Sequence, residues 1–189
     1  MPTRSRLGHS RPADRRPIRS SPKPPRPPII TAVRSADFDE VAFFRSAHQS
    51  GARALLIGRR ALVLLGLPVL TADYDFWISI DDIDKFNRAA ASSELTPSLD
   101  AEAARQRGRY VLENDEHVDV LVAPSIPTVD GVPVAFDDVW TRRQTISLAP
   151  DAVVCVPEID DLILTKRFAN RPKDVEDIRL LNVLKGKDT

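Results

Sequence analysis

The sequence of 189 residues contains a single cysteine, Cys155, which excludes an internal disulfide bond. We expect Cys155, within the run AVVCV, to be a small buried side chain rather than a nucleophile. The sequence also lacks the apolar run of about 18 residues that a membrane-spanning helix requires, because Arg59 and Arg60 interrupt the best candidate. It begins without the apolar core of a signal peptide. These absences predict a cytoplasmic protein with no membrane partner.

The formal net charge is zero, but the charges are unevenly distributed. Residues 1–28 hold eight of the 16 prolines, seven arginines and Lys23 against one acid, Asp14. Such a segment has few large apolar side chains to bury, so we expect residues 1–30 to form a disordered basic tail. The tail could neutralise nucleic-acid phosphates, or it could be a solvated extension without a partner. We favour the extension, because no aromatic residue alternates with the arginines.

Residues 31–189 are predicted to form one folded domain, since 42% of the chain is hydrophobic and can supply a core. Periodicity and capping residues indicate helices at 35–51 (capped by Ser35), 59–65, 81–95, 157–168 and 173–184, with a helical turn near 135–143. Apolar or alternating runs indicate strands at 54–57, 74–80, 109–112, 117–122, 144–148 and 152–156. Residues 96–109 could form a polar loop or a lid, and we favour a loop. This order predicts a mixed-sheet α/β domain with a helical C-terminal part.

Two carboxylates, Asp73 and Asp75, flank Tyr74 at the start of a predicted strand. Side chains alternate along a strand, so both carboxylates are expected on the same face. Like charges in one small space repel each other, and a hard cation such as Mg²⁺ would relieve the repulsion. Asp-X-Asp also occurs at strand ends where both groups are solvated, and the pair alone leaves both interpretations open.

A third acid, Asp119, lies within the apolar strand HVDVLV. An unpaired carboxylate in such a strand is costly, so Asp119 requires either a neighbouring arginine or a metal. His117 shares its predicted face and could border a site, although we favour a histidine at the surface of a hairpin.

Three motifs, taken in order, resemble the polymerase-β-like nucleotidyltransferases. Gly58-Arg59 is followed after thirteen residues by Asp73-Tyr74-Asp75, and Asp119 stands where that family has a third carboxylate. The stretch VPEIDDLILTKRFANRPKDVEDIRLL resembles the helical part of the minimal nucleotidyltransferases and of the toxins of type IV toxin–antitoxin pairs. Its matching residues are Lys166, Arg171, Lys173 and Asp174, with Asp177 one turn further on.

The resemblance implies a nucleotidyltransferase fold, a small mixed β-sheet flanked by helices. It implies transfer of a nucleoside monophosphate from an NTP to a hydroxyl on RNA, such as tRNA, or on protein, and it suggests an antitoxin partner. It assigns catalysis and the binding of Mg²⁺ or Mn²⁺ to Asp73, Asp75 and Asp119, since two metals stabilise the attacking and leaving oxygens in such reactions. It assigns binding of the phosphates to Gly58, Arg59, Arg60, Lys166 and Arg171.

The sequence departs from this family at Arg59 and Arg60, because the family has Gly or Ser after the first glycine. A long cation can pair with phosphate, or it can fill the site and abolish turnover. Two functions therefore stay open: an active metal-dependent nucleotidyltransferase, and a catalytically inactive binding module of the same fold for nucleic acid or a partner protein. A purely structural or antitoxin-like subunit is a third.

The C-terminal motif also has a simpler interpretation. KRFANRPKDVEDI is typical of a solvated pair of helices linked by surface salt bridges. Under this interpretation Arg167, Lys173, Asp174 and Asp177 have no role in a site.

Overall fold

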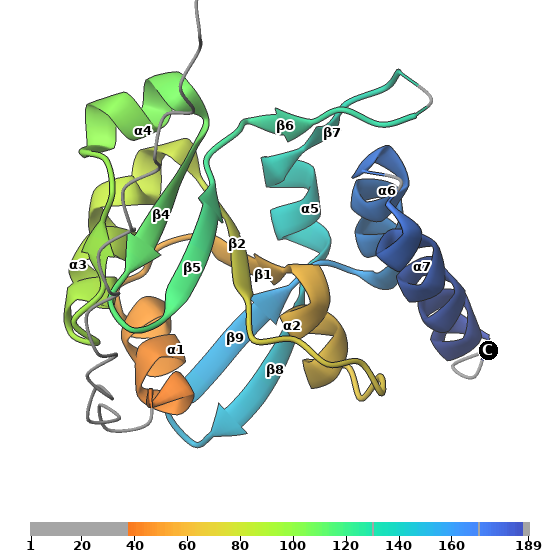
Figure 1. Cartoon of the computed structure of the whole chain (residues 1–189), viewed down its shortest axis with the longest axis horizontal. Helices are drawn as coiled ribbons and strands as arrows, with labels where there is room; N and C mark the ends of the chain where they lie inside the picture. The colour runs from red at the N-terminus through yellow and green to blue at the C-terminus, as the bar shows by residue number, and fades with distance from the viewer. Residues whose placement is uncertain (1–37, 130, 170, 187–189) are drawn as a thin grey trace, which may run out of the picture. The chain divides into compact units, whose positions relative to one another are not determined.

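A seven-stranded mixed sheet runs through the described part of the chain, with helices packed on both of its faces (Figure 1). The computed structural model describes residues 38–129, 131–169 and 171–186, so the predicted tail, residues 1–30, lies outside the described residues. The observed architecture is the mixed α/β class that the sequence predicts.

The helices in chain order are α1 (Glu40–Gln49), α2 (Gly58–Leu64), α3 (Ile83–Ala91), α4 (Ala101–Arg107), α5 (Phe136–Arg142), α6 (Ile159–Ala169) and α7 (Pro172–Lys185), and a 3₁₀ turn, η1 (Ile80–Asp82), precedes α3. The strands are β1 (Ala54–Ile57), β2 (Tyr74–Ile78), β3 (Thr96–Pro97), β4 (Arg109–Glu113), β5 (His117–Leu121), β6 (Ser125–Ile126), β7 (Val134–Ala135), β8 (Gln144–Ala149) and β9 (Ala152–Val156).

The order of the strands in the large sheet is β3-β4-β5-β2-β1-β9-β8, and β6 and β7 form a separate two-stranded ribbon. Most neighbours are antiparallel, but β2 pairs with β5 in parallel and β1 pairs with β9 in parallel. The parallel pairing of β2 with β5 sets Asp75 directly opposite Asp119. Residues 44 positions apart in the sequence are thereby neighbours in the sheet.

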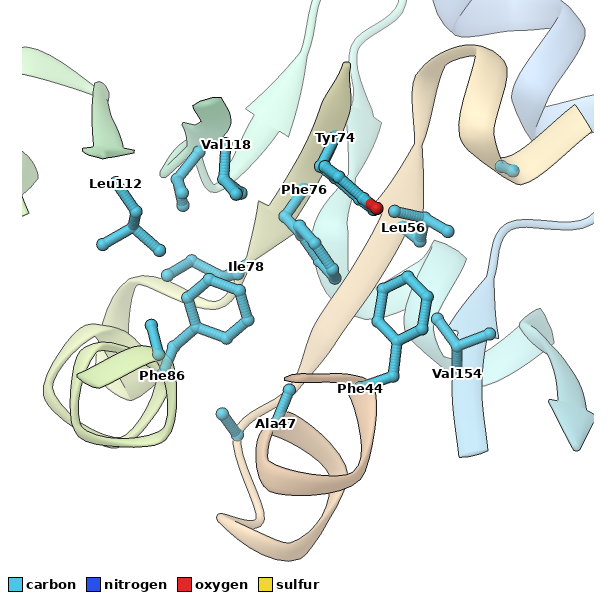
Figure 2. Close-up of a cluster of buried hydrophobic side chains, with 14 of the residues drawn as sticks. Phe44, Ala47, Leu56, Tyr74, Phe76, Ile78, Phe86, Leu112, Val118 and Val154 are labelled. Carbon is cyan, nitrogen blue, oxygen red and sulfur yellow. The ribbon is translucent and has the colours of Figure 1, made fainter. Parts of the chain in front are cut away.

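The alternation of side chains along β2 separates an apolar face from the face that carries the acids. Tyr74, Phe76 and Ile78 join the main core beneath α1 and α3, where Figure 2 shows Phe44 and Phe86 approaching them from the two helices. Trp77, one residue out of phase, lies on the opposite face in a second buried cluster against α5. Because Asp75 is two residues before Trp77, its side chain belongs to this second face.

Most of the predicted elements are present, and the predicted bounds of β1 are confirmed. The first helix begins later than predicted, at Glu40, and its N-cap is Asp39, whose carboxylate accepts a hydrogen bond from the Ala42 amide at 2.9 Å. The predicted cap, Ser35, lies outside the described residues.

The prediction of a loop over 96–109 is wrong, because the segment contains β3 and α4. Asp100 caps α4 by accepting a hydrogen bond from the Ala103 amide at 2.8 Å. The helix ends at Gly108, which has a φ of 76°. An acidic N-cap at one end and a glycine at the other were the signals of a helix in this stretch.

The two C-terminal helices pack against each other, and α7 also packs against α2. Leu162 and Ile163 of α6 and Leu181 of α7 join the main core. In the described residues, no helix is long and apolar enough to cross a membrane.

The cap of α4 supplies a first test of the fold. Replacing Asp100 by Ala removes the acceptor of the Ala103 amide, so we expect the free energy of unfolding to fall by about 1 kcal/mol. Asp100→Asn keeps a side-chain acceptor, so its free energy of unfolding should fall by less. Urea denaturation of both variants measures the difference, and equal losses would show that the cap is not the cause.

Candidate active site

A cleft of about 310 Å³ opens where β1, β2 and β5 meet the helices α2, α6 and α7. This volume is at the lower end of the range typical of small-molecule sites. Its charged lining consists of Asp73, Asp75, Asp119, Asp174, Asp177, Arg59, Lys166, Arg171 and Lys173. The structure therefore brings the three predicted carboxylates together with three of the predicted phosphate-binding cations.

Asp75 and Asp119 form the centre of the acidic wall. They are directly paired across the parallel strands β2 and β5. Asp73 precedes the first residue of β2 and also lines the cleft. The Asp119 side chain is 58% exposed, and its Oδ2 lies 3.6 Å from Nε2 of His117, which is half exposed at the surface of the hairpin. Asp73 and Asp119 are thus both exposed, whereas Asp75 is half-buried.

The pKa of Asp75 is raised above its ordinary value. Burial is the largest cause, followed by the negative charges of Asp119 and Asp73, while Lys173 and Lys166 act in the opposite direction. The two neighbouring negative charges make Asp75 harder to ionise. A bound cation would remove this penalty.

Gly58 lies against the Asp75 carboxylate. A Cβ built on Gly58 would stand 1.9 Å from Oδ2 and 2.7 Å from Cγ of Asp75, and the φ of Gly58 is 66°. Only glycine fits this position without displacing the acid. In the structure, the space that Gly58 leaves open is occupied by the carboxylate of Asp75.

The donor set fits a hard divalent metal. Asp73, Asp75 and Asp119 all offer carboxylate oxygens to the cleft. Among the residues that the structure describes, no group of three or more His, Cys, Asp or Glu side chains is placed so that it could hold a metal ion by itself. Mg²⁺ usually binds only one or two carboxylates and completes its shell with substrate phosphates and water, so two of these acids together with a triphosphate could hold it. Binding of Mg²⁺ or Mn²⁺ by the three acids stays a prediction.

The opposite wall is organised by Asp177 of α7, whose side chain is fully buried at 0% exposure. Nε of Arg59 donates to the two carboxylate oxygens of Asp177 at 3.1 and 3.2 Å. Nζ of Lys166 donates to Oδ2 of Asp177 at 2.9 Å. One buried carboxylate therefore holds a cation from α2 and a cation from α6.

Arg171 is held in the same way by Asp174. Its Nε donates to Oδ2 at 2.7 Å, and its backbone amide donates to the same oxygen at 3.0 Å. Burial would raise the pKa of Asp174, but the hydrogen bonds from Arg171 outweigh it and the pKa is lowered. The hydrogen bond to Asp174 is also the main reason why the pKa of Arg171 is raised.

Arg60 lies outside the cleft, which corrects its predicted role in phosphate binding. Its Nη1 lies 3.2 Å from Oε2 of Glu40, and its guanidinium carbon lies 4.4 Å from the centroid of the Tyr74 ring. Oε2 of Glu40 also accepts the Tyr74 hydroxyl at 2.8 Å. Arg60 thus ties α2 to α1 and β2 on the side of the main core.

The sequence interpretation of Asp174 and Asp177 as members of a solvated helix pair is wrong, since both are buried. A signal for their burial was present. Asp174 and Asp177 each precede an apolar residue of α7 by four positions, Ile178 and Leu181 respectively, so they lie on the apolar face of the helix. Buried acids on a helix face require cationic, hydrogen-bonded partners, which here are Arg59, Lys166 and Arg171.

Comparison with solved structures identifies the fold. A candidate nucleotidyltransferase from Thermotoga maritima is 14% identical, with a TM-score of 0.50, over 72% of this chain and 86% of that chain. Two structures of the antibiotic-resistance factor ANT(2″)-Ia, one in complex with adenylyl-2″-tobramycin, are also 14% identical. Their TM-scores are 0.48 and 0.46, over 77% of this chain and 86% and 92% of theirs. No family model matches the sequence, and neither does any curated protein.

The likeness to the Thermotoga protein confirms the predicted nucleotidyltransferase fold. At this level of identity it shows the fold alone. The activity has to be argued from the residues in the cleft.

The contact between Gly58 and Asp75 gives a test with a matched control. Gly58→Ala and Gly66→Ala both place a Cβ at a positive φ, which costs about 1 kcal/mol. The Cβ at Gly66 meets nothing within 4 Å, whereas the Cβ at Gly58 meets the Asp75 carboxylate. We expect Gly58→Ala to cost about 1–3 kcal/mol more than Gly66→Ala in urea denaturation.

A double variant separates the clash from other causes. In an Asp75→Ala background the two nearest atoms are absent, so the penalty of Gly58→Ala should shrink. An undiminished penalty would place the cause elsewhere.

The raised pKa of Asp75 predicts that this acid destabilises the metal-free protein at neutral pH. A pKa that is higher in the folded state makes stability fall as the pH rises from the ordinary aspartate value, about 3.9, through the folded value. We therefore expect Asp75→Asn to increase the free energy of unfolding at pH 7 without divalent ions. The gain should vanish below about pH 4. Urea denaturation at the two pH values tests this, and a less stable variant at pH 7 would contradict it.

Proposed function

We propose that this protein is a metal-dependent nucleotidyltransferase, which transfers a nucleoside monophosphate from an NTP to a hydroxyl on RNA or protein. The observation that carries the proposal is the pairing of Asp75 with Asp119 on adjacent parallel strands, at the wall of a cleft whose other wall is cationic. Carboxylates on one side and cations on the other are suited to a metal–triphosphate complex. The fold of the chain is consistent with this chemistry.

The reaction would be an in-line displacement at the α-phosphorus. The bond from the acceptor oxygen to phosphorus forms, the bond to the bridging oxygen breaks, and pyrophosphate leaves. Asp73, Asp75 and Asp119 would hold the metal, which when bound stabilises charge on the attacking and leaving oxygens.

Asp119 is the residue suited to accept the proton of the acceptor hydroxyl. Its side chain is 58% exposed and lines the cleft, so a hydroxyl on a large molecule can reach it. Asp75 is deeper and has a raised pKa, and it is better placed to bind a cation than to meet an acceptor.

An open carboxylate suits a hydroxyl carried by RNA, such as tRNA, or by protein. A toxin role and an antitoxin partner rest on the resemblance of the C-terminal helices to type IV toxins, and they stay predictions.

One observation favours the second function, an inactive binding module. Arg59 lines the cleft where the family has a small residue, and its guanidinium is fixed by the buried Asp177. A side chain held in this way cannot swing out of the cleft without leaving a buried carboxylate short of a partner.

Incubation of the full chain with each α-labelled NTP, Mg²⁺, total tRNA and a protein extract tests the proposal. We expect labelled RNA or protein, lost on chelation of Mg²⁺. Asp119→Asn should lower the rate by about a hundredfold or more, because it removes both an acceptor of the proton and a charge. Asp115→Asn, which removes an exposed acid from the same hairpin but outside the cleft, is the matched control.

A thermal shift separates the two functions. Mg²⁺ should stabilise the wild type and not the Asp75→Asn, Asp119→Asn double variant. A shift without labelled product from any NTP would favour the binding module. No shift in the wild type would remove the basis of the proposed enzyme.

A further inference from the structure

The charges in the cleft do not favour a bare polyanion. Five carboxylates and four cations line it, which leaves a formal net charge of −1. An NTP that enters without a divalent ion would therefore meet net repulsion. Each of the four cations can pair with a phosphate only if its present partners leave it free to move.

Two of the four cations, Arg59 and Lys166, share the buried carboxylate of Asp177. The Lys166 side chain is itself 8% exposed. Moving either cation toward a ligand would weaken its bond to a carboxylate that has no access to water, and breaking a buried pair is strongly unfavourable. These two side chains therefore keep their positions when a ligand binds.

The third cation, Arg171, is less buried but equally engaged. Its side chain and its backbone amide both donate to Asp174, as the capping interaction at the start of α7. Withdrawing the guanidinium would disturb both the helix cap and a carboxylate that is 1% exposed.

The fourth cation, Lys173, differs from the others. It lies in the first turn of α7, is exposed, and lines the cleft. Within the described residues it forms no ion pair and no hydrogen bond through its side chain.

We propose that Lys173 is the residue that pairs with the phosphates of the incoming nucleotide. This inference rests on the proposed function and adds to it a binding residue. A lysine is a flexible point charge, so Lys173 can follow the phosphates without breaking an existing bond. Arg59, Lys166 and Arg171 form a fixed positive wall, and Lys173 is the mobile contact.

Binding of inorganic tripolyphosphate in the presence of Mg²⁺, measured by calorimetry on the full chain, tests this assignment. The probe lacks a base and a ribose, so it reports on the phosphate contacts alone. We expect Lys173→Met to raise Kd about tenfold or more, as for loss of a charge-assisted hydrogen bond. Lys173→Arg should recover much of the affinity. Arg179→Met, which removes an exposed cation from the same helix but outside the cleft, should change Kd by less than about twofold.

Thermal denaturation distinguishes a binding role of Lys173 from a structural one, because only a structural role would change the melting temperature of the variant. Because Lys173 holds no partner among the described residues, the melting temperature of Lys173→Met should equal that of the wild type. Lys166→Met should melt at a lower temperature, because it removes a partner of the buried Asp177. Equal Kd values for the wild type and Lys173→Met would overturn this inference and leave the proposed function intact. A wild type that does not bind the probe with Mg²⁺ would overturn both.

Discussion

The buried carboxylate of Asp177 is the interaction on which the cleft depends. It takes one cation from α2, at the end of β1, and one from α6, so it joins the C-terminal helices to the sheet. A buried carboxylate is stable only when it is paired and hydrogen-bonded. Two partners satisfy Asp177, and the same requirement fixes the wall that faces Asp75 and Asp119. Figure 1 shows α6 and α7 side by side, next to α2.

The acidic wall has the opposite character, because its groups are unfavourable together. Asp75 lies against Gly58 with no room for a side chain there, and its pKa is raised by burial and by two neighbouring acids. Functional sites often retain groups that reduce stability. In this cleft the unfavourable charges lie at Asp73 and on the paired strands β2 and β5, which carry Asp75 and Asp119. The rest of β2 packs Tyr74, Phe76 and Ile78 into the core and fixes the acid in place.

Much of the fold was predictable from local sequence, while the site depended on contacts between distant residues. The strand bounds of β1 follow from a short apolar run, and the face shared by Tyr74 and Phe76 follows from alternation. That Asp119 stands beside Asp75 was available only through the resemblance, because local patterns do not reveal which strands pair in parallel. Arg60 could not be separated from Arg59, since neighbouring residues on a helix point to different sides and only the packing shows which side faces the cleft.

The sequence left two roles for Arg59, to bind a triphosphate or to exclude it, and the structure supports a third. Its guanidinium is committed to Asp177, and its side chain remains 29% exposed at the edge of the cleft. A cation that is neutralised by a buried carboxylate attracts a phosphate less strongly than a free cation does. It is also held away from the space where a phosphate would lie. Arg59 therefore acts as part of the wall. Whether the protein is active then depends on the three acids of the cleft, Asp73, Asp75 and Asp119, and on Lys173, whose charge is available for a ligand.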